Sequence, residues 1–244
     1  MSTHAPDRDP APQLQLRLLG GFQLDLDGQP LWLPHSVRRV IAFLGIRGRS
    51  DRTEVAGTLW PDLPEPKARA SLRTALWRMH RLTTAAVVTG SEALALAPPV
   101  RVDLQALEDA VRRLVTGDGA PDRAPAVVLP AAGELLPGWY DDWVLFERER
   151  IRQLRLHALE TLAGRLTVAG RYGEAIDVAL TAVRLEPLRE SATRSLILAH
   201  LGEGNLIEAV RCFESFREQL AVELGVHPSP KLAQLVQSCL TRQL

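Results

Sequence analysis

The chain has 244 residues, and its 29 lysine and arginine residues balance 29 aspartate and glutamate residues, so the formal net charge is zero. A length of this order fits about two domains, and a hydrophobic content of 46% suffices for packed cores, which excludes a wholly disordered chain. Zero charge alone would argue against a nucleic-acid binder. However, residues 1–100 hold 12 basic and 9 acidic residues, whereas residues 101–244 hold 17 basic and 20 acidic residues. The neutral total therefore combines a basic first part with an acidic second part.

The first segment, residues 1–13, is rich in proline and polar side chains, and we expect it to be disordered. It has no apolar stretch typical of a signal peptide, and no run in the chain approaches the roughly 18 apolar residues that cross a bilayer. Cys212 and Cys239 belong to no CxxC pair or histidine cluster, which argues against a zinc site. We therefore expect a cytoplasmic, soluble protein with no membrane contact and with no metal or cofactor.

A small antiparallel sheet is predicted to follow this segment. Leu14–Leu19 and Phe22–Leu26 alternate apolar and polar residues and are separated by a pair of glycines. An Asp-Gly pair at residues 27 and 28 is a strong turn signal. We expect a third strand after it, at Leu31–Leu33.

Three helices and a hairpin are expected next. Ser36 is predicted to cap the first helix, which buries Val37 and Ile41 and ends near Gly45–Gly48. The remaining elements are a helix at Arg52–Leu59, a helix at Pro66–Leu82, and a hairpin of strands Ala86–Thr89 and Ala93–Ala97. Strands, three helices and a hairpin in this order are typical of a winged helix, which we predict for residues 14–99.

The third predicted helix carries the strongest functional signal. Its apolar stripe includes Ala68, Leu72 and Met79, and its other face is basic. Residues 36–83 hold ten basic and four acidic residues, a local balance of +6. In a winged helix this helix enters the major groove, so we predict a DNA-binding surface. Its members are Lys67, Arg69, Arg73, Thr74, Trp77, Arg78 and Arg81, with Arg38 and Arg39 of the first helix as clamps on the DNA backbone.

Plainer interpretations of these residues stay open. A solvated charged face is common on amphipathic helices, and 27 of the 29 basic residues are arginine, as a GC-rich genome alone would produce. Trp77 fits a buried anchor against the hairpin as well as a DNA contact. The hairpin tip, residues 89–92, has no arginine to insert into the minor groove, and we expect Arg101 to be the nearest cation.

Residues 100–244 are predicted to form a second, helical domain, with only helices after Pro99. The expected elements are a helix at Leu104–Val115 capped by Asp103, a loop at Thr116–Pro130, a long helix at Asp141–Ala169 and a final helix at Pro230–Leu240. An offset of 34 residues aligns Gly170 with Gly204 and Ala175 with Ala209, which indicates tetratricopeptide-like repeats. An ordinary antiparallel helix bundle is the alternative.

Four stretches together resemble a known family: LWLPHSVRRVIAFL, LWPDLPEPKARASLRTALWRMHRL, LLPGWYDDWVLFERERIRQLRLHALETLA and ELGVHPSP. The chain is similar to bacterial transcriptional activator domain proteins, and more narrowly to the SARP class of regulators. The resemblance covers residues 14–240 and implies a mainly α fold with a small β component. An OmpR-type winged helix-turn-helix would precede an all-α tetratricopeptide-like domain, with the DNA-contacting helix at Lys67–Leu82.

The resemblance also implies an activity and partners. Members of this class are cytoplasmic activators that bind direct repeats in promoter double-stranded DNA and recruit RNA polymerase holoenzyme, often at secondary-metabolite (antibiotic) gene clusters. We expect a small stand-alone form without ATPase, receiver or sensor domain, and a homodimer that forms on DNA or before it. The chain departs from the class in its hairpin tip, which lacks a basic residue, and at Ala70, where many members carry a polar residue.

No pattern in the sequence points to an enzyme. The six histidines are scattered singly, and the motifs GxxxxGK[ST], GxSxG and HExxH are absent. Asp141 and Asp142 adjoin in sequence but do not face each other on a helix, and Asp141 is a better helix cap than a catalytic acid. The alternative to a transcription activator is a tetratricopeptide-like scaffold that binds a partner protein and has weak or lost DNA binding.

Overall fold

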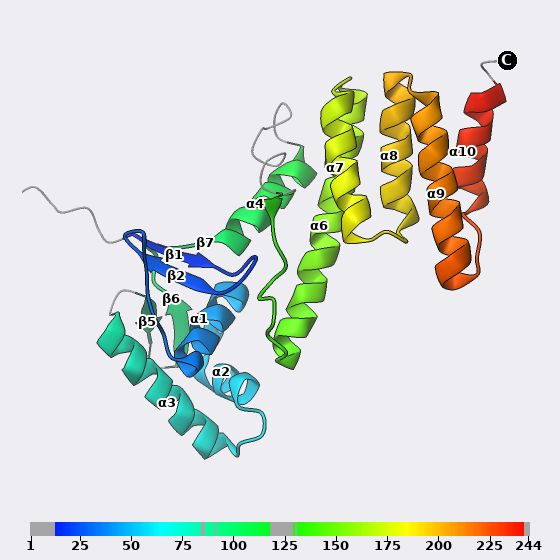
Figure 1. Cartoon of the computed structure of the whole chain (residues 1–244). Coiled ribbons are helices and arrows are strands. Elements are labelled where there is room, and N and C mark those ends of the chain that lie inside the picture. The colour runs from blue at the N-terminus through cyan, green and yellow to red at the C-terminus, as the bar shows by residue number, and fades with distance from the viewer. Residues whose placement is uncertain (1–12, 84–85, 91, 118–128, 130, 242–244) are drawn as a thin grey trace, which may run out of the picture. The chain divides into compact units, whose positions relative to one another are not determined.

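The structure, a computed structural model of the whole chain, describes residues 13–83, 86–90, 92–117, 129 and 131–241 (Figure 1). The chain divides into two compact units: unit 1 consists of Met1–Ala106 and Gly133–Arg148, and unit 2 of Leu107–Ala132 and Glu149–Leu244. The domain ranges 14–99 and 100–244 stay a prediction, and the compact units group residues 100–106 and 133–148 with the N-terminal part. Of the segment predicted to be disordered, residues 1–12 lie outside the described residues.

Unit 1 contains a four-stranded sheet built around the first strand of the chain. Its strands are β1 (Leu14–Arg17), β2 (Gln23–Leu26), β3 (Gln29–Pro30) and β7 (Val100–Val102), in the spatial order β3-β2-β1-β7. β1 pairs antiparallel with β2 and parallel with β7. Because side chains alternate across a strand, Leu14 and Leu16 are buried while Gln15 between them is exposed.

The prediction of a third strand at Leu31–Leu33 is wrong in position. The two turn residues 27 and 28 both have positive φ angles, 50° and 80°. After a two-residue turn of this kind, the next residue already pairs with the preceding strand. The third strand therefore begins at Gln29, opposite Leu26.

The prediction that only helices follow Pro99 is also wrong. Val100–Val102 pairs with β1 and buries both valines. Three residues are too few to show the alternating pattern of a strand in the sequence. These three form a strand because β1, from the start of the chain, lies beside them.

Three helices and a second sheet complete unit 1 as a winged helix. They are α1 (His35–Arg47), β4 (Ser50–Asp51), α2 (Arg52–Leu59), α3 (Glu65–Leu82), β5 (Val87–Thr89) and β6 (Ala93–Leu96), with the sheet order β4-β6-β5. Ser36 does not cap α1. Pro34 holds the cap position, and its carbonyl oxygen accepts hydrogen bonds from the backbone N–H groups of Val37 and Arg38.

Residues Gly133–Arg148, here called the return segment, join unit 1 from later in the chain. The backbone N–H of Gly20 donates to the carbonyl oxygen of Glu134 (2.7 Å), which fastens the segment to the turn between β1 and β2. Gly133 has to be small at this approach, because a Cβ there would lie 2.8 Å from the backbone nitrogen of Gly20.

Side chains of the return segment lock it onto α1. The indole of Trp143 packs edge-on against Phe43, with ring centroids 5.4 Å apart. The guanidinium of Arg148 holds the shape of the segment by donating to three of its carbonyl oxygens, those of Leu135, Leu136 and Trp139. The return segment comes much later in the sequence than the winged helix, but it packs as part of the same compact unit.

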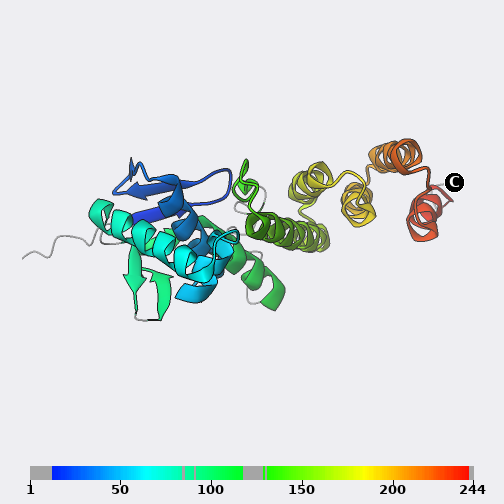
Figure 2. The same cartoon turned by 90° about the horizontal axis from the view of Figure 1, so that it is seen from below.

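The described part of unit 2 is helical. It comprises the later parts of α4 (Asp103–Thr116) and α6 (Asp142–Val168), then α7 (Tyr172–Leu185), α8 (Glu190–Glu203), α9 (Leu206–Leu224) and α10 (Pro230–Thr241). α7 to α10 lie side by side in chain order, as Figures 1 and 2 show. The predicted loop Thr116–Pro130 falls mostly on residues 118–128 and 130, which lie outside the described residues.

Small and apolar side chains pack the helices of unit 2 together. Ala175, Ala182 and Ala209 are fully buried, and their size allows neighbouring helices to approach closely. α10 packs on α9 through an apolar cluster that includes Phe216 and Leu220 of α9 and Leu232 and Val236 of α10. Together with unit 1, this arrangement confirms the predicted fold class, a winged helix followed by an all-α tetratricopeptide-like domain.

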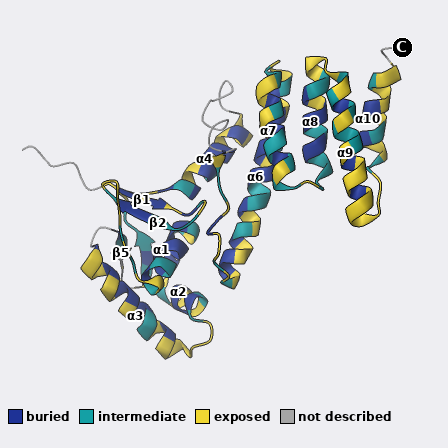
Figure 3. Ribbon diagram, viewed as in Figure 1, coloured by how far each residue is buried: buried dark blue, intermediate teal, exposed yellow. Residues whose placement is uncertain are grey.

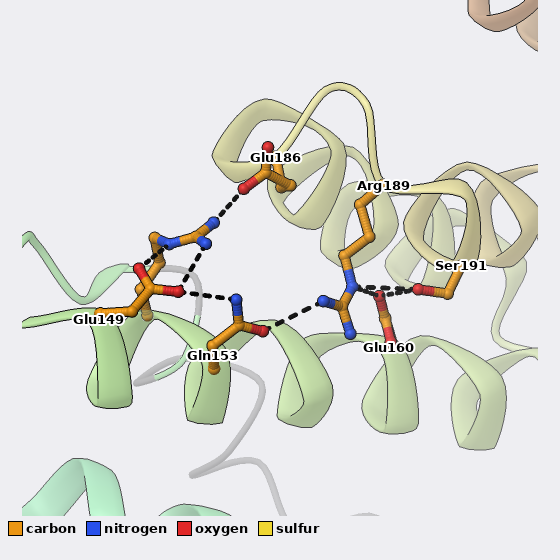
Figure 4. A network of polar contacts seen from close by, with 7 residues as sticks. Glu149, Gln153, Glu160, Glu186, Arg189 and Ser191 are labelled. Carbon is orange, nitrogen blue, oxygen red and sulfur yellow. Dashed lines mark hydrogen bonds and ion pairs between the residues drawn. The ribbon is translucent and has the colours of Figure 1, made fainter. Parts of the chain in front are cut away.

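A row of polar contacts fastens α6 to the connection between α7 and α8 (Figure 4). Arg152 pairs with Glu149 of the same helix (2.8 Å) and with Glu186 at the end of α7. Arg189, which precedes α8, donates to Glu160 of α6 (2.6 Å). The connection is thus held at both of its ends.

Trp143→Ala is expected to lower the free energy of unfolding of unit 1 by about 3–5 kcal/mol, because the indole is almost fully buried against Phe43. The matched control is Tyr140→Ala, since Tyr140 lies in the same segment and is 79% exposed. Urea unfolding followed by far-ultraviolet circular dichroism measures both variants. Equal, small losses would show that the return segment does not stabilise the unit.

Glu149 is expected to have a pKa of about 2, because the Arg152 guanidinium, and after it the Gln153 amide, donate hydrogen bonds to its carboxylate. The lowered pKa means that the ionised carboxylate stabilises unit 2 above its ordinary pKa of 4.5, and that this contribution is lost as the pH falls through about 2. Carboxyl-carbon NMR between pH 2 and 7 distinguishes a Glu149 carboxylate that stays ionised to about pH 3 from one that titrates near 4.5. In Arg152→Ala the pKa is expected to return toward 4.5, and a pKa still near 2 would refute this cause.

Candidate nucleic-acid interface

Helix α3 separates apolar from basic side chains, because apolar residues recur along it at spacings of three and four. Ala68, Leu72, Ala75, Leu76 and Met79 form its buried stripe, and α3 packs on α1 and α2. The opposite face is largely exposed (Figure 3). Seven of the predicted site residues lie along it and are all exposed: Lys67, Arg69, Arg73, Thr74, Trp77, Arg78 and Arg81.

The basic residues of this face differ in whether they have partners. Lys67, Arg73 and Arg78 make no ion pair and no side-chain hydrogen bond with any other described residue, so their charges are open to an anion. Arg69 pairs with Glu65 one turn earlier (2.8 Å). Such an exposed pair contributes only about 0.3–0.5 kcal/mol, so a phosphate can replace the carboxylate at little cost.

Trp77 is 59% exposed, so its alternative interpretation as a buried anchor against the hairpin is wrong. The guanidinium of Arg81 lies over its ring, 5.0 Å from the centroid, which is a cation–π contact. The hydroxyl of Thr74 donates to the carbonyl oxygen of Ala70 (3.0 Å). Its own oxygen remains able to accept a hydrogen bond from outside.

Two hollows border α3 on the side of the hairpin, and both are lined by Arg52 and Arg73. The larger has a volume of about 600 Å³ and is also lined by Asp51, Glu54, Arg69 and Glu92. The smaller, of about 280 Å³, is also lined by Trp77, His80 and Val87. Two guanidinium groups from different helices therefore face the same space beside α3.

The hairpin of β5 and β6 is the wing, and its tip is fastened to α2 by Arg52. Nε and Nη2 of Arg52 donate to the carbonyl oxygen of Gly90 (3.2 and 3.1 Å). The cation beside the tip is thus Arg52 and not Arg101, which lies on β7 in the other sheet. The contact joins residues 38 positions apart. No strand was predicted from the sequence before α2, but Ser50 and Asp51 pair with the hairpin as β4 and so bring Arg52 to its tip.

Arg38 and Arg39 contact the first sheet and the return segment. The guanidinium of Arg38 lies over the rings of Phe22 and Trp139, 5.0 and 5.6 Å from their centroids. Arg39 pairs with Asp141, and the two side chains are 16% and 22% exposed. Both arginines have partners within unit 1 and, unlike the basic residues of α3, neither is exposed, so they are not part of the interface proposed below.

The described part of the chain holds neither a metal cluster nor a membrane-spanning helix. No group of three or more histidine, cysteine, aspartate or glutamate side chains is arranged there to bind a metal ion. No helix of the described residues is long and apolar enough to cross a membrane. The basic face of α3 and the hollows beside it are thus the strongest candidate site among these residues.

Residues 102–240 match the family described as bacterial transcriptional activator domain. Two curated relatives are both named Regulatory protein AfsR. The one from Streptomyces coelicolor is 28% identical over 240 residues, 93% of this chain, and the one from Streptomyces griseus is 30% identical over 208 residues, 79% of this chain. The chain spans only 24% and 21% of the lengths of these relatives.

A solved structure shares the fold of the chain. It is that of Mycobacterium tuberculosis EmbR in complex with a low-affinity phosphopeptide, with a TM-score of 0.73 and 21% sequence identity. The likeness covers 95% of this chain and 66% of the EmbR chain. It supports the fold described above, a small β component at the N-terminal end followed by helices.

Arg39→Ala is expected to lower the free energy of unfolding of unit 1 by roughly 1.5–3 kcal/mol, because it leaves the partly buried Asp141 without its partner. Asp141→Ala should do the same, and the double variant should lose less than the sum of the two. Urea unfolding of the wild type and the three variants gives the coupling energy. Strictly additive losses are incompatible with a direct ion pair.

Proposed function

The chain belongs to the family of the bacterial transcriptional activator domain, as a regulator of the SARP class, and from this premise we propose that it binds promoter DNA and activates transcription. The family membership establishes a transcriptional regulator. Binding to double-stranded promoter DNA and recruitment of RNA polymerase are the finer proposal. Because the curated relatives are much longer than this chain, their whole activities are not ascribed to it.

The observation that carries the proposal is the set of unpaired cations on the exposed face of α3. Lys67, Arg73 and Arg78 have no described partner, and they lie opposite the buried stripe that attaches the helix to unit 1. The major groove of B-DNA, about 12 Å wide, admits one helix with its side chains. A winged helix uses its third helix in this way, so the basic face is suited to a duplex.

Different roles are inferred along this helix. Arg69, Arg73 and Thr74 contact base edges or the closest phosphates, since an arginine fork matches the two acceptors on the edge of guanine. Lys67, Arg78 and Arg81 neutralise backbone phosphates. Trp77 presents an exposed ring in the same row.

Unit 2 is proposed to bind protein. Its residues, 107–132 and 149–244, hold 15 basic and 15 acidic residues, so unit 2 has no excess of positive charge to favour a second contact with DNA. The proposed partners are RNA polymerase holoenzyme and a neighbouring copy of the chain, because direct repeats in a promoter place two copies next to each other. The resemblance to the SARP class favours genes of secondary metabolism as targets, in the cytoplasm of a bacterium.

The double variant Arg73→Ala, Arg78→Ala is expected to lose most of its affinity for a promoter fragment while keeping its fold. Two lost phosphate contacts should make the slope of log K against log salt shallower by about 1.8, that is, about 0.9 for each contact. Fluorescence anisotropy at several salt concentrations measures both values, on a fragment selected from genomic DNA of the native host. The matched control is Arg211→Ala, Arg217→Ala, which removes the same charge from exposed positions on α9.

An affinity and slope equal to those of the wild type would refute the role of α3. A wild-type chain that binds no duplex at all, while unit 2 captures a partner protein, would favour the scaffold alternative. Chromatin immunoprecipitation with sequencing in the native host then identifies the bound promoters and the repeat that is read.

A further inference from the structure

We propose that Arg52 positions the wing for DNA and supplies the positive charge that the wing tip itself lacks, so that Arg52 and Arg73 hold one phosphate of the DNA backbone between them. This inference rests on the proposed binding of DNA by α3. It assigns a role to a residue of α2 that the pattern of the sequence did not indicate.

The wing tip is unsuited to DNA when considered alone. Its four residues, 89–92, include no cation and one carboxylate, that of Glu92. A phosphate repels such a carboxylate, and a tip without a basic side chain has nothing to insert into a minor groove. A cation from another element has to compensate if the wing is to lie against the duplex.

Arg52, the first residue of α2, places such a cation beside the tip. Nε and Nη2 of Arg52 donate to the carbonyl oxygen of Gly90, at 3.2 and 3.1 Å. The backbone N–H of Arg52 donates to the carbonyl oxygen of Glu92, at 2.9 Å. The two residues before Arg52 form β4 and pair with β6, opposite Leu94 and Ala93. One residue therefore joins the tip to α2 through both its side chain and its backbone.

The charge of Arg52 is left uncompensated by these contacts. Gly90 accepts through a neutral carbonyl, and Arg52 forms no ion pair with any described residue, although Asp51, Glu54 and Glu92 line the same hollow. A guanidinium carries five N–H donors, and the bonds to Gly90 use two of them. The remaining donors are open to an oxygen anion.

Arg73 of α3 supplies the second half of the site. It lines both hollows together with Arg52, and it too has no described partner. The larger hollow, of about 600 Å³, is open enough to admit a phosphate group. Planar guanidinium forks bind phosphate oxygens through paired, charge-assisted hydrogen bonds, which makes a backbone phosphodiester the fitting ligand.

The pair Arg52→Lys and Arg52→Gln in the full chain separates charge from structure. Lysine keeps the charge, and glutamine keeps a donor for Gly90 without the charge. We expect Arg52→Gln to bind the selected promoter fragment about tenfold more weakly, with a shallower salt slope that changes by less than the roughly 0.9 of a whole phosphate contact, because Arg73 still faces the shared phosphate. Arg52→Lys should keep the wild-type slope but lose hydroxyl-radical protection of the backbone where the tip lies, because a point charge does not hold Gly90 through two donors.

The control is Arg101→Gln, which removes one exposed arginine of unit 1 from the other sheet and is expected to leave the slope and footprint unchanged. Thermal unfolding establishes that each variant is folded before its binding is measured. If Arg52→Gln has the slope and footprint of the wild type, or if both Arg52 variants weaken binding with no change in slope, the proposal is overturned and Arg52 is only a structural clip.

The failure of this inference and the failure of the proposed function give different results. If the wild-type chain binds no duplex, the proposed function fails, and the role of Arg52 fails with it. If the wild type binds and the Arg73→Ala, Arg78→Ala variant is weakened, but Arg52→Gln is not, only the inference about the wing fails.

Discussion

Burial of the apolar stripe of α3 determines which of its side chains face solvent, and thereby where the protein can bind an anion. Leu72 and Met79 are 2% and 3% exposed in a unit where α3 packs on α1 and α2. With that face fixed, the helical period leaves Arg73 and Arg78 only the opposite surface. A chain with zero net charge can thus present a basic surface, since packing decides which charges gather, and the total charge does not.

Features that depend on local physics could be predicted from the sequence. α2 lies at Arg52–Leu59 as expected, and α3 begins at Glu65, one residue earlier than expected, since a proline is tolerated in the first turn of a helix. The exposed face of α3 followed from the spacing of its apolar residues alone. The side chains of the candidate interface could therefore be predicted from the sequence, whereas their contacts, such as the pair of Arg69 with Glu65, could not.

Contacts between distant residues could not be predicted in this way. Arg39 and Asp141 are 102 positions apart; Asp141 does precede α6 as a helix cap would, but its carboxylate pairs with Arg39, which its place in the sequence did not indicate. The periodicity of a segment reports which face is buried but not what covers it. The return segment shows the consequence: it lies within the matched family domain of residues 102–240, yet it completes unit 1 and holds Arg39 away from the solvent.

In the proposed complex, the exposed face of α3 lies against the DNA. A photoreactive phenylalanine analogue at position 77 replaces one exposed aromatic side chain by another and tests this placement directly on the full chain. Irradiation of the complex with its promoter fragment is predicted to cross-link position 77 to the DNA, and to give no cross-link from the same group at Ile207 of α9, which is 67% exposed. Cross-links from position 207 and none from position 77 would contradict the account.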